Sequence, residues 1–152
     1  MGPANIFAAL HRAVEDASRA MLFTVTILDR NRRLARRVYS SNPTDYPVTG
    51  IKPVSANAWT AQVIDRGEVF VANSTAEFAP YFADHALINA LGCEAALNIP
   101  ISADGKVVGT VNVLGARDIF TEDRVAALNQ VVADYRAALV TAFDKVSMEN
   151  RV

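Results

Sequence analysis

The sequence has a single cysteine, Cys93, among its 152 residues. A lone cysteine excludes a disulfide within the chain. There is also no apolar run near the ~18 residues that a membrane-spanning helix needs. The first residues carry Glu15 and Asp16 and no basic segment, so we expect no signal peptide. Together these absences predict a cytoplasmic protein without a membrane span.

The sequence has no excess of charge of either sign: 15 basic and 16 acidic residues leave a net charge of −1. This balance gives no reason to expect nucleic acid or an anionic membrane as a partner. The only two histidines, His11 and His85, lie far apart and not at metal-ligand spacing with Cys93. No Ser-His-Asp, paired-carboxylate or glycine-rich phosphate motif is present. The sequence therefore predicts no metal, no cofactor and no catalytic residue.

What the sequence does have is the composition of a globular domain, with 51% hydrophobic and 20% charged residues. Its length fits one domain, over 1–152. Hydrophobic periodicity and turn residues predict helices over 4–19, 55–66 (with Ser55 as N-cap), 84–92 and from 122 to 143 or beyond. They predict strands over 21–28, 34–40, 68–72, 94–102 and 106–114, and irregular segments over 41–54 and 73–83. This order favours an α+β fold with a mainly antiparallel sheet of five or six strands.

The last third of the chain, "LGCEAALNIPISADGKVVGTVNVLGARDIFTEDRVAAL", resembles the GAF domain family. The earlier "AMLFTVTILDRNRRL" and "SANAWTAQVIDRGEVFVAN" are also similar to parts of that fold. The resemblance covers nearly the whole chain and implies a free-standing GAF domain. It implies terminal helices on one face of the sheet and a ligand pocket under irregular segments on the other. Members of the family include small-molecule sensors and one group of enzymes, the free-methionine-sulfoxide reductases.

The two strands of the last third alternate between an apolar face and a small or polar face. A three-residue turn over 103–105 would pair Ser102 with Lys106 and keep the two apolar faces together. Asn98 would then lie opposite Thr110, with Asn112 diagonal to it. These three polar side chains would share the face away from the terminal helices.

We expect a ligand pocket on this polar face, mostly apolar with a few placed polar groups. The candidate ligand-binding residues are Asn98, Asn112, Thr110, Phe23, Tyr39, Trp59, Phe78, Tyr81, Phe82, His85 and Leu114. Two interpretations of the amides stay open: Asn98 and Asn112 either satisfy each other, a loop or water, or they orient a ligand. Each aromatic residue is either plain core or pocket wall, and His85 either caps a helix at the surface or contacts the ligand.

Cys93 is predicted to point to the helix side of the sheet as a small buried hydrophobic residue. The further cysteines on which the reductases rely are absent, as are the motifs of bilin-binding and cyclic-nucleotide-binding GAF domains. The run 30–37 packs five arginines into what we interpret as a solvated hairpin tip. Contact with an acidic protein or a phosphate is the alternative.

The last helix is apolar on more than one face, and the first is rich in alanine. Both features favour a homodimer through the terminal helices. The sequence as a whole predicts a non-enzymatic, small-molecule-binding sensory or regulatory domain. An enzyme acting on a small metabolite, similar to the reductases, and a protein-interaction module with a vestigial pocket are the alternatives.

Overall fold

A computed structural model describes residues 2–146 of the chain. Its centre is a six-stranded sheet in the order β3-β2-β1-β6-β5-β4, with every neighbouring pair antiparallel. The strands are β1 (Leu22–Asp29), β2 (Leu34–Ser40), β3 (Lys52–Pro53), β4 (Phe70–Ala72), β5 (Ala95–Ala103) and β6 (Lys106–Gly115). The predicted α+β class and mainly antiparallel sheet are confirmed. Residues 1 and 147–152 of the predicted domain lie outside the described residues.

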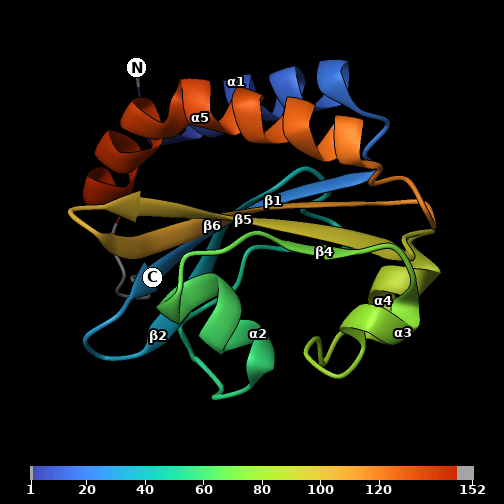
Figure 1. Ribbon diagram of the computed structural model, residues 1–152. Coiled ribbons are helices and arrows are strands. Elements are labelled where there is room, and N and C mark those ends of the chain that lie inside the picture. The colour runs from blue at the N-terminus through green and yellow to red at the C-terminus, as the bar shows by residue number, and fades with distance from the viewer. Residues whose placement is uncertain (1, 147–152) are drawn as a thin grey trace.

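Two terminal helices, α1 (Pro3–Ala17) and α5 (Glu122–Lys145), lie side by side on one face of the sheet (Figure 1). The sequence explains their starts: proline occupies the first turn of α1, and the Thr121 hydroxyl caps α5 by accepting a hydrogen bond from the Arg124 amide. The other face carries the short elements α2 (Ala58–Thr60), a π-helical turn η1 (Ala61–Asp65), α3 (Thr75–Phe78) and α4 (His85–Ala90).

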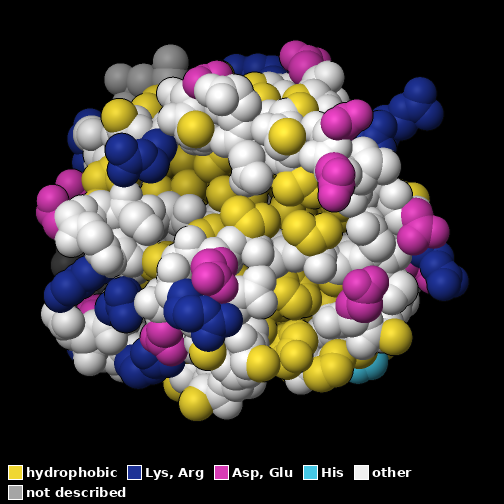
Figure 2. All heavy atoms as spheres, in the orientation of Figure 1, with side chains coloured by type: hydrophobic (Ala, Val, Ile, Leu, Met, Phe, Trp, Pro, Cys, Tyr) yellow, Lys and Arg dark blue, Asp and Glu magenta, His cyan; other side chains and the backbone are white. Residues whose placement is uncertain are grey.

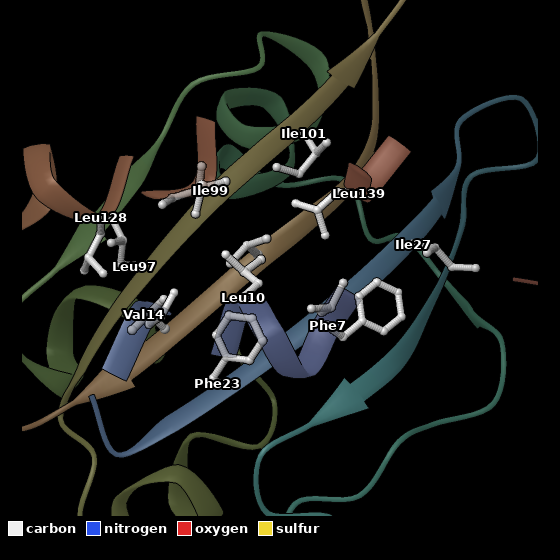
Figure 3. Packing of buried hydrophobic residues seen from close by; sticks show 14 of the residues in the cluster. Phe7, Leu10, Val14, Phe23, Ile27, Leu97, Ile99, Ile101, Leu128 and Leu139 are labelled. Carbon is white, nitrogen blue, oxygen red and sulfur yellow. The ribbon is translucent and has the colours of Figure 1, made fainter. Parts of the chain in front are cut away.

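The main core fills the space between the terminal helices and the sheet (Figure 3). Phe7, Leu10 and Val14 of α1 pack there against the apolar face of the central strands. Gly109 of β6 permits this close packing, since a Cβ atom there would lie 2.6 Å from both the Phe143 ring and the Thr26 carbonyl oxygen. The helix-facing side of the sheet therefore carries the main apolar core.

The β5–β6 hairpin differs from its predicted register. Asp104 and Gly105, both with positive φ, form a two-residue turn that pairs Ala103 with Lys106. A β-bulge after Ile101 then restores the alternation of faces. Asn98 consequently pairs with Asn112, and Thr110 pairs with Pro100, so the predicted pairing of Asn98 with Thr110 is wrong.

The helix predicted over 55–66 begins later than expected and changes type. Asn57, not Ser55, is its N-cap, with the Asn57 Oδ1 accepting from the Thr60 amide at 2.8 Å. Ser and Asn cap equally well, so local sequence does not distinguish the two starts. After Thr60 the chain continues as the π-helical turn η1, which ends at Asp65, and Gly67 then takes a left-handed conformation with a φ of 65°.

Candidate functional site

An open cavity of about 390 Å³ lies on the sheet face opposite the terminal helices. Its floor comes from β1, β5 and β6, and its walls come from three covering segments. The sequence predicts that the stretches 41–54 and 73–92 cover the polar strands, and the segments 46–54 and 81–88 fall within them. The third, 55–64, adds α2 and η1 to the wall. π-helical turns occur often at functional sites, and this one lies at the cavity.

A chain of hydrogen bonds crosses the cavity floor. The Trp59 indole Nε1 donates to Asn98 Oδ1 at 3.0 Å, and Asn98 Nδ2 donates to Asn112 Oδ1 at 2.8 Å. Asn112 Nδ2 in turn donates to the hydroxyls of Thr24 and Thr26, at 3.1 and 3.3 Å. Because the indole can only donate, the whole series has one direction. Both amide side chains are therefore held in a single orientation.

This chain of bonds bears on the two interpretations of the amides. Asn98 and Asn112 do satisfy each other, as one interpretation required, and both also line the cavity. Asn98 is almost fully buried, with 4% of its surface exposed. The two amides thus form a polar floor whose direction is fixed before any ligand arrives.

A second polar group forms the wall at the β2 side of the cavity. Tyr46, from the loop after β2, donates its hydroxyl proton to Asp84 Oδ2 at 2.5 Å and accepts from Arg37 Nη2 at 2.8 Å. The Arg37 guanidinium also stacks over the Tyr46 ring, 3.9 Å from its centroid. Arg37 Nη1 donates to the carbonyl oxygen of Pro47 at 3.0 Å. This Arg37–Tyr46–Asp84 group joins β2, the covering loop and the start of α4.

The electrostatics of the group keep Tyr46 neutral. Burial raises the pKa of its phenol well above the usual value of 10.0, and the hydrogen bond to Asp84 acts in the same direction. The nearby Arg37 guanidinium opposes both effects without cancelling them. Tyr46 therefore remains a hydrogen-bond donor to Asp84 throughout the physiological pH range.

Most of the sequence-predicted residues do lie around the cavity. Those in its lining are Asn98, Thr110, Asn112, Trp59, Tyr81, Phe82 and Leu114. Phe78 is fully buried behind Phe82, with ring centroids 5.3 Å apart, and does not reach the cavity. His85 begins α4 next to Asp84 and is also outside the lining.

Phe23 and Tyr39 lie on the opposite face of the sheet, so their placement in the pocket is wrong. Phe23 belongs to the core under α1, where its ring stacks on the His11 ring with centroids 5.4 Å apart. The Tyr39 hydroxyl forms a hydrogen bond with His11 Nδ1 at 3.2 Å. Phe23 lies on the helix side because alternate residues of β1 share a face, and Phe23 alternates with the core residues Val25 and Ile27. For Tyr39 the reason is a β-bulge in the β1–β2 pair, which places Tyr39 opposite Val25.

Cys93 also differs from its predicted side. It is fully buried in the smaller apolar cluster beside the cavity, with Tyr46, Phe78 and Ile88, and not under the terminal helices. Strand parity does not apply to it because β5 begins only at Ala95, after Gly92 takes a left-handed conformation (φ 88°). Burial raises the pKa of the Cys93 thiol to about 11, so the thiol is protonated at neutral pH.

Sequence reasoning missed two sets of cavity residues. Thr24 and Thr26 could have been found, since they alternate with the apolar residues of the first predicted strand. Arg37, Tyr46 and Asp84 carry no local signal, because the residues that meet are far apart in the chain. Only the folded structure separates Arg37 from the other arginines of the run 30–37.

The remaining arginines of that run pair within the chain or lie near the surface. Arg30 and Arg33 approach Asp65, at 3.7 and 3.2 Å, and Arg32 pairs with Asp29 at 2.7 Å. Figure 2 shows Lys and Arg side chains interspersed with Asp and Glu over the visible face, so no large area of one charge sign covers it.

Across residues 2–146, no group of three or more His, Cys, Asp or Glu side chains is arranged to hold a metal ion. In the same part of the chain no helix is long and apolar enough to cross a membrane.

Comparison with known proteins adds a family and a fold. A family model for the GAF domain matches residues 3–140, which is most of the chain. No curated protein matches the sequence. Among solved structures, the GAF domain of a two-component sensor histidine kinase from Bacillus halodurans has a TM-score of 0.71 at 15% identity, covering 93% of both chains.

Two further structures are similar at low identity. A GAF domain/HD domain protein from Geobacter sulfurreducens has a TM-score of 0.73 at 12% identity and covers 92% of this chain and 93% of its own. A type II free methionine-R-sulfoxide reductase from Thermoplasma acidophilum has a TM-score of 0.69 at 12% identity and covers 93% of this chain and 92% of its own. The fold is thus shared by sensors and by an enzyme.

Proposed function

We propose that this chain, which belongs to the GAF domain family, binds a small molecule in the cavity and acts as a sensory or regulatory domain without catalysing a reaction. The observation that carries the proposal is the cavity with its pre-oriented floor. The bonds from Trp59 through Asn98 to Asn112 fix polar groups beside apolar walls. Binding sites for small molecules combine these two features.

The cavity volume argues against the interpretation as an interaction module with a vestigial pocket. Such a module would fill the pocket with its own side chains. Here about 390 Å³ stays open, within the range of about 300–1,000 Å³ usual for ligand sites. The aromatic residues stand along the walls, where Trp59 and Phe82 meet edge to face with centroids 6.1 Å apart, and leave the centre open.

The titratable groups support binding over catalysis. An enzyme of the reductase type needs an accessible thiolate, whereas Cys93 is fully buried and outside the cavity lining. Burial raises the pKa of both Cys93 and Tyr46, which keeps each group protonated at neutral pH. A catalytic nucleophile or general base would instead need a pKa shifted toward neutral pH.

Native mass spectrometry of freshly purified protein tests this proposal. We expect a mass above the 16.4 kDa of the chain by that of one small molecule. Asn98→Leu, which removes a cavity amide, should lower the retained fraction. Asn89→Leu is the matched control, because Asn89 bonds Thr75 and the His85 carbonyl outside the cavity.

Two results would contradict the proposal. One is that the wild-type protein carries no molecule and no compound of a metabolite library raises its melting temperature. The other is that both variants retain the molecule equally well while remaining folded by circular dichroism. Turnover of a metabolite that Cys93→Ala abolishes would favour an enzyme instead.

A further inference from the structure

The wall of the cavity contains one cation that is well placed for a ligand, Arg37. It lies on β2 opposite Thr26, on the cavity face of the sheet, with 19% of its side chain exposed. A guanidinium has five N–H donors. Two of them serve the Pro47 carbonyl and the Tyr46 hydroxyl. These two bonds and the Tyr46 ring fix the orientation of the guanidinium and leave further donors for a bound group.

Asp84 neutralises this cation only in part. Its Oδ2 lies 3.7 Å from Arg37 Nη2, which is beyond hydrogen-bond distance, and the same oxygen accepts the Tyr46 proton at 2.5 Å. Asp84 is also the more exposed partner, at 39% against 19%. The pair is therefore not the bidentate arrangement in which a carboxylate saturates an arginine.

The charges of the whole cavity lining also favour an anionic ligand. Arg37 and Lys52 are its two cations and Asp84 is its one carboxylate, which leaves a formal charge of +1. The other lining residues are uncharged. A ligand with a single negative charge would balance the cavity, and a planar carboxylate matches the fork of the guanidinium.

The floor limits the length of such a ligand. Arg37 on β2 and Asn98 on β5 are separated by β1 and β6. Three steps between strands, each of about 4.8 Å, place the two backbones about 14 Å apart. Arg37 and Asn98 both line the cavity, so a ligand that contacts both must extend across the floor between them. Trp59, Phe82 and Leu114 supply apolar walls for such a ligand.

We propose that the cavity binds a monocarboxylic acid with a compact apolar body, whose acid group is held by Arg37 and whose far end meets the Asn98–Asn112 floor. This inference rests on the proposed function, since it names the chemical class of the ligand. The Thr110 and Thr26 hydroxyls between the two ends lie along the same path. The floor favours a ligand with a hydrogen-bonding group at the end opposite the acid.

Isothermal titration calorimetry with matched probes tests the inference. The probes are 4-hydroxybenzoate, its neutral amide 4-hydroxybenzamide and the cationic 4-hydroxybenzylamine, which share one ring and one hydroxyl. We expect the acid to bind about 10- to 100-fold more tightly than the amide, as for loss of a charged hydrogen-bond partner. The amine should bind most weakly.

Variants separate Arg37 from general charge effects. Arg37→Met should bring the affinity for the acid down to that for the amide, and Arg37→Lys should restore part of it. Arg33→Met is the matched control, since it removes the same charge from the same hairpin, outside the cavity. It should leave binding within about twofold.

Three results would overturn the inference: equal affinity for acid and amide, tighter binding of the amine, or an equal loss in Arg33→Met and Arg37→Met. No binding of any probe at millimolar concentration would also overturn it. The acid–amide comparison needs only the wild-type protein, so a variant that fails to fold does not remove the test. If native mass spectrometry finds a retained neutral molecule, the inference fails while the proposed function stands.

Discussion

The bond between Trp59 and Asn98 offers a sharp test of the cavity floor. Asn98→Leu keeps the shape of the side chain but removes two hydrogen bonds, from Trp59 Nε1 at 3.0 Å and to Asn112 Oδ1 at 2.8 Å. At about 1 kcal/mol for each bond, the free energy of unfolding should fall by about 2 kcal/mol. For a chain of this size that corresponds to a melting temperature lower by about 4–8 °C.

A double-mutant cycle isolates the single bond. Trp59→Phe removes the indole donor and leaves Asn98 Oδ1 without it. If the bond stabilises the fold, Trp59→Phe and Asn98→Leu together should cost about 1 kcal/mol less than the sum of the two single variants. Unfolding in urea should be followed by far-ultraviolet circular dichroism, because Trp59 is the only tryptophan and its loss removes the fluorescence signal.

The control cycle pairs Trp59→Phe with Asn89→Leu. Asn89 bonds Thr75 and the backbone of His85, so the control pair shares no partner. Its effects should add to within about 0.5 kcal/mol. Equal additivity in both cycles would refute the reasoning, because the indole and the amide would then be independent and the floor would not be held in one orientation.

Three further predictions concern packing, pH and assembly. Gly109→Ala should lower the free energy of unfolding by about 1–3 kcal/mol in urea, because its Cβ would lie 2.6 Å from the Thr26 carbonyl oxygen, which belongs to the backbone and cannot rotate away. Burial raises the pKa of Cys93 from 9.0 to about 11, so above pH 9 the unfolded chain loses a proton that the folded chain keeps. The free energy of unfolding should therefore fall by about 2 kcal/mol toward pH 11. Cys93→Ala should make this fall smaller, and the same dependence on pH in wild type and variant would contradict the raised pKa of Cys93. Sedimentation velocity at micromolar concentration should show a dimer formed through α1 and α5, whereas a monomer of 16.4 kDa would exclude it.

The layering of the fold follows from patterns that the sequence carries locally. Alternation in 94–102 and 106–114 assigns one face of each strand to the core, and the capping residue Thr121 marks the start of α5. The pairing of the same two strands was wrong by two residues along β6, because a two-residue turn combined with a bulge gives the same alternation as a three-residue turn. Periodicity therefore determines which side chains share a face but not which of them are partners.

The composition of the cavity wall was less accessible to sequence reasoning. Asparagine is disfavoured in strands and a buried amide needs hydrogen-bond partners, so Asn98 and Asn112 are identifiable from the sequence as candidate site residues. Tyr46 and Asp84 lie in a loop and at a helix start, where polar residues are ordinary. Asp84 stands at the N-cap position of α4, yet its side chain makes no capping bond and accepts the Tyr46 proton instead. Such a role depends on a contact across the fold.

The arginine run 30–37 shows how a structural irregularity can select one residue from several of the same type. Arg36 lies opposite Ile27 on the helix side of the sheet, and Arg37 lies opposite Thr26 on the cavity side. The bulge that follows Arg37 lets Tyr39 return to the helix side, although Arg37 and Tyr39 are two residues apart and would share a face in a regular strand. The bulge thus sends the aromatic ring to the core and leaves the guanidinium in the cavity. One extra residue in β2 separates Arg37, on the cavity side of the sheet, from the side chains of the same strand that lie on the helix side.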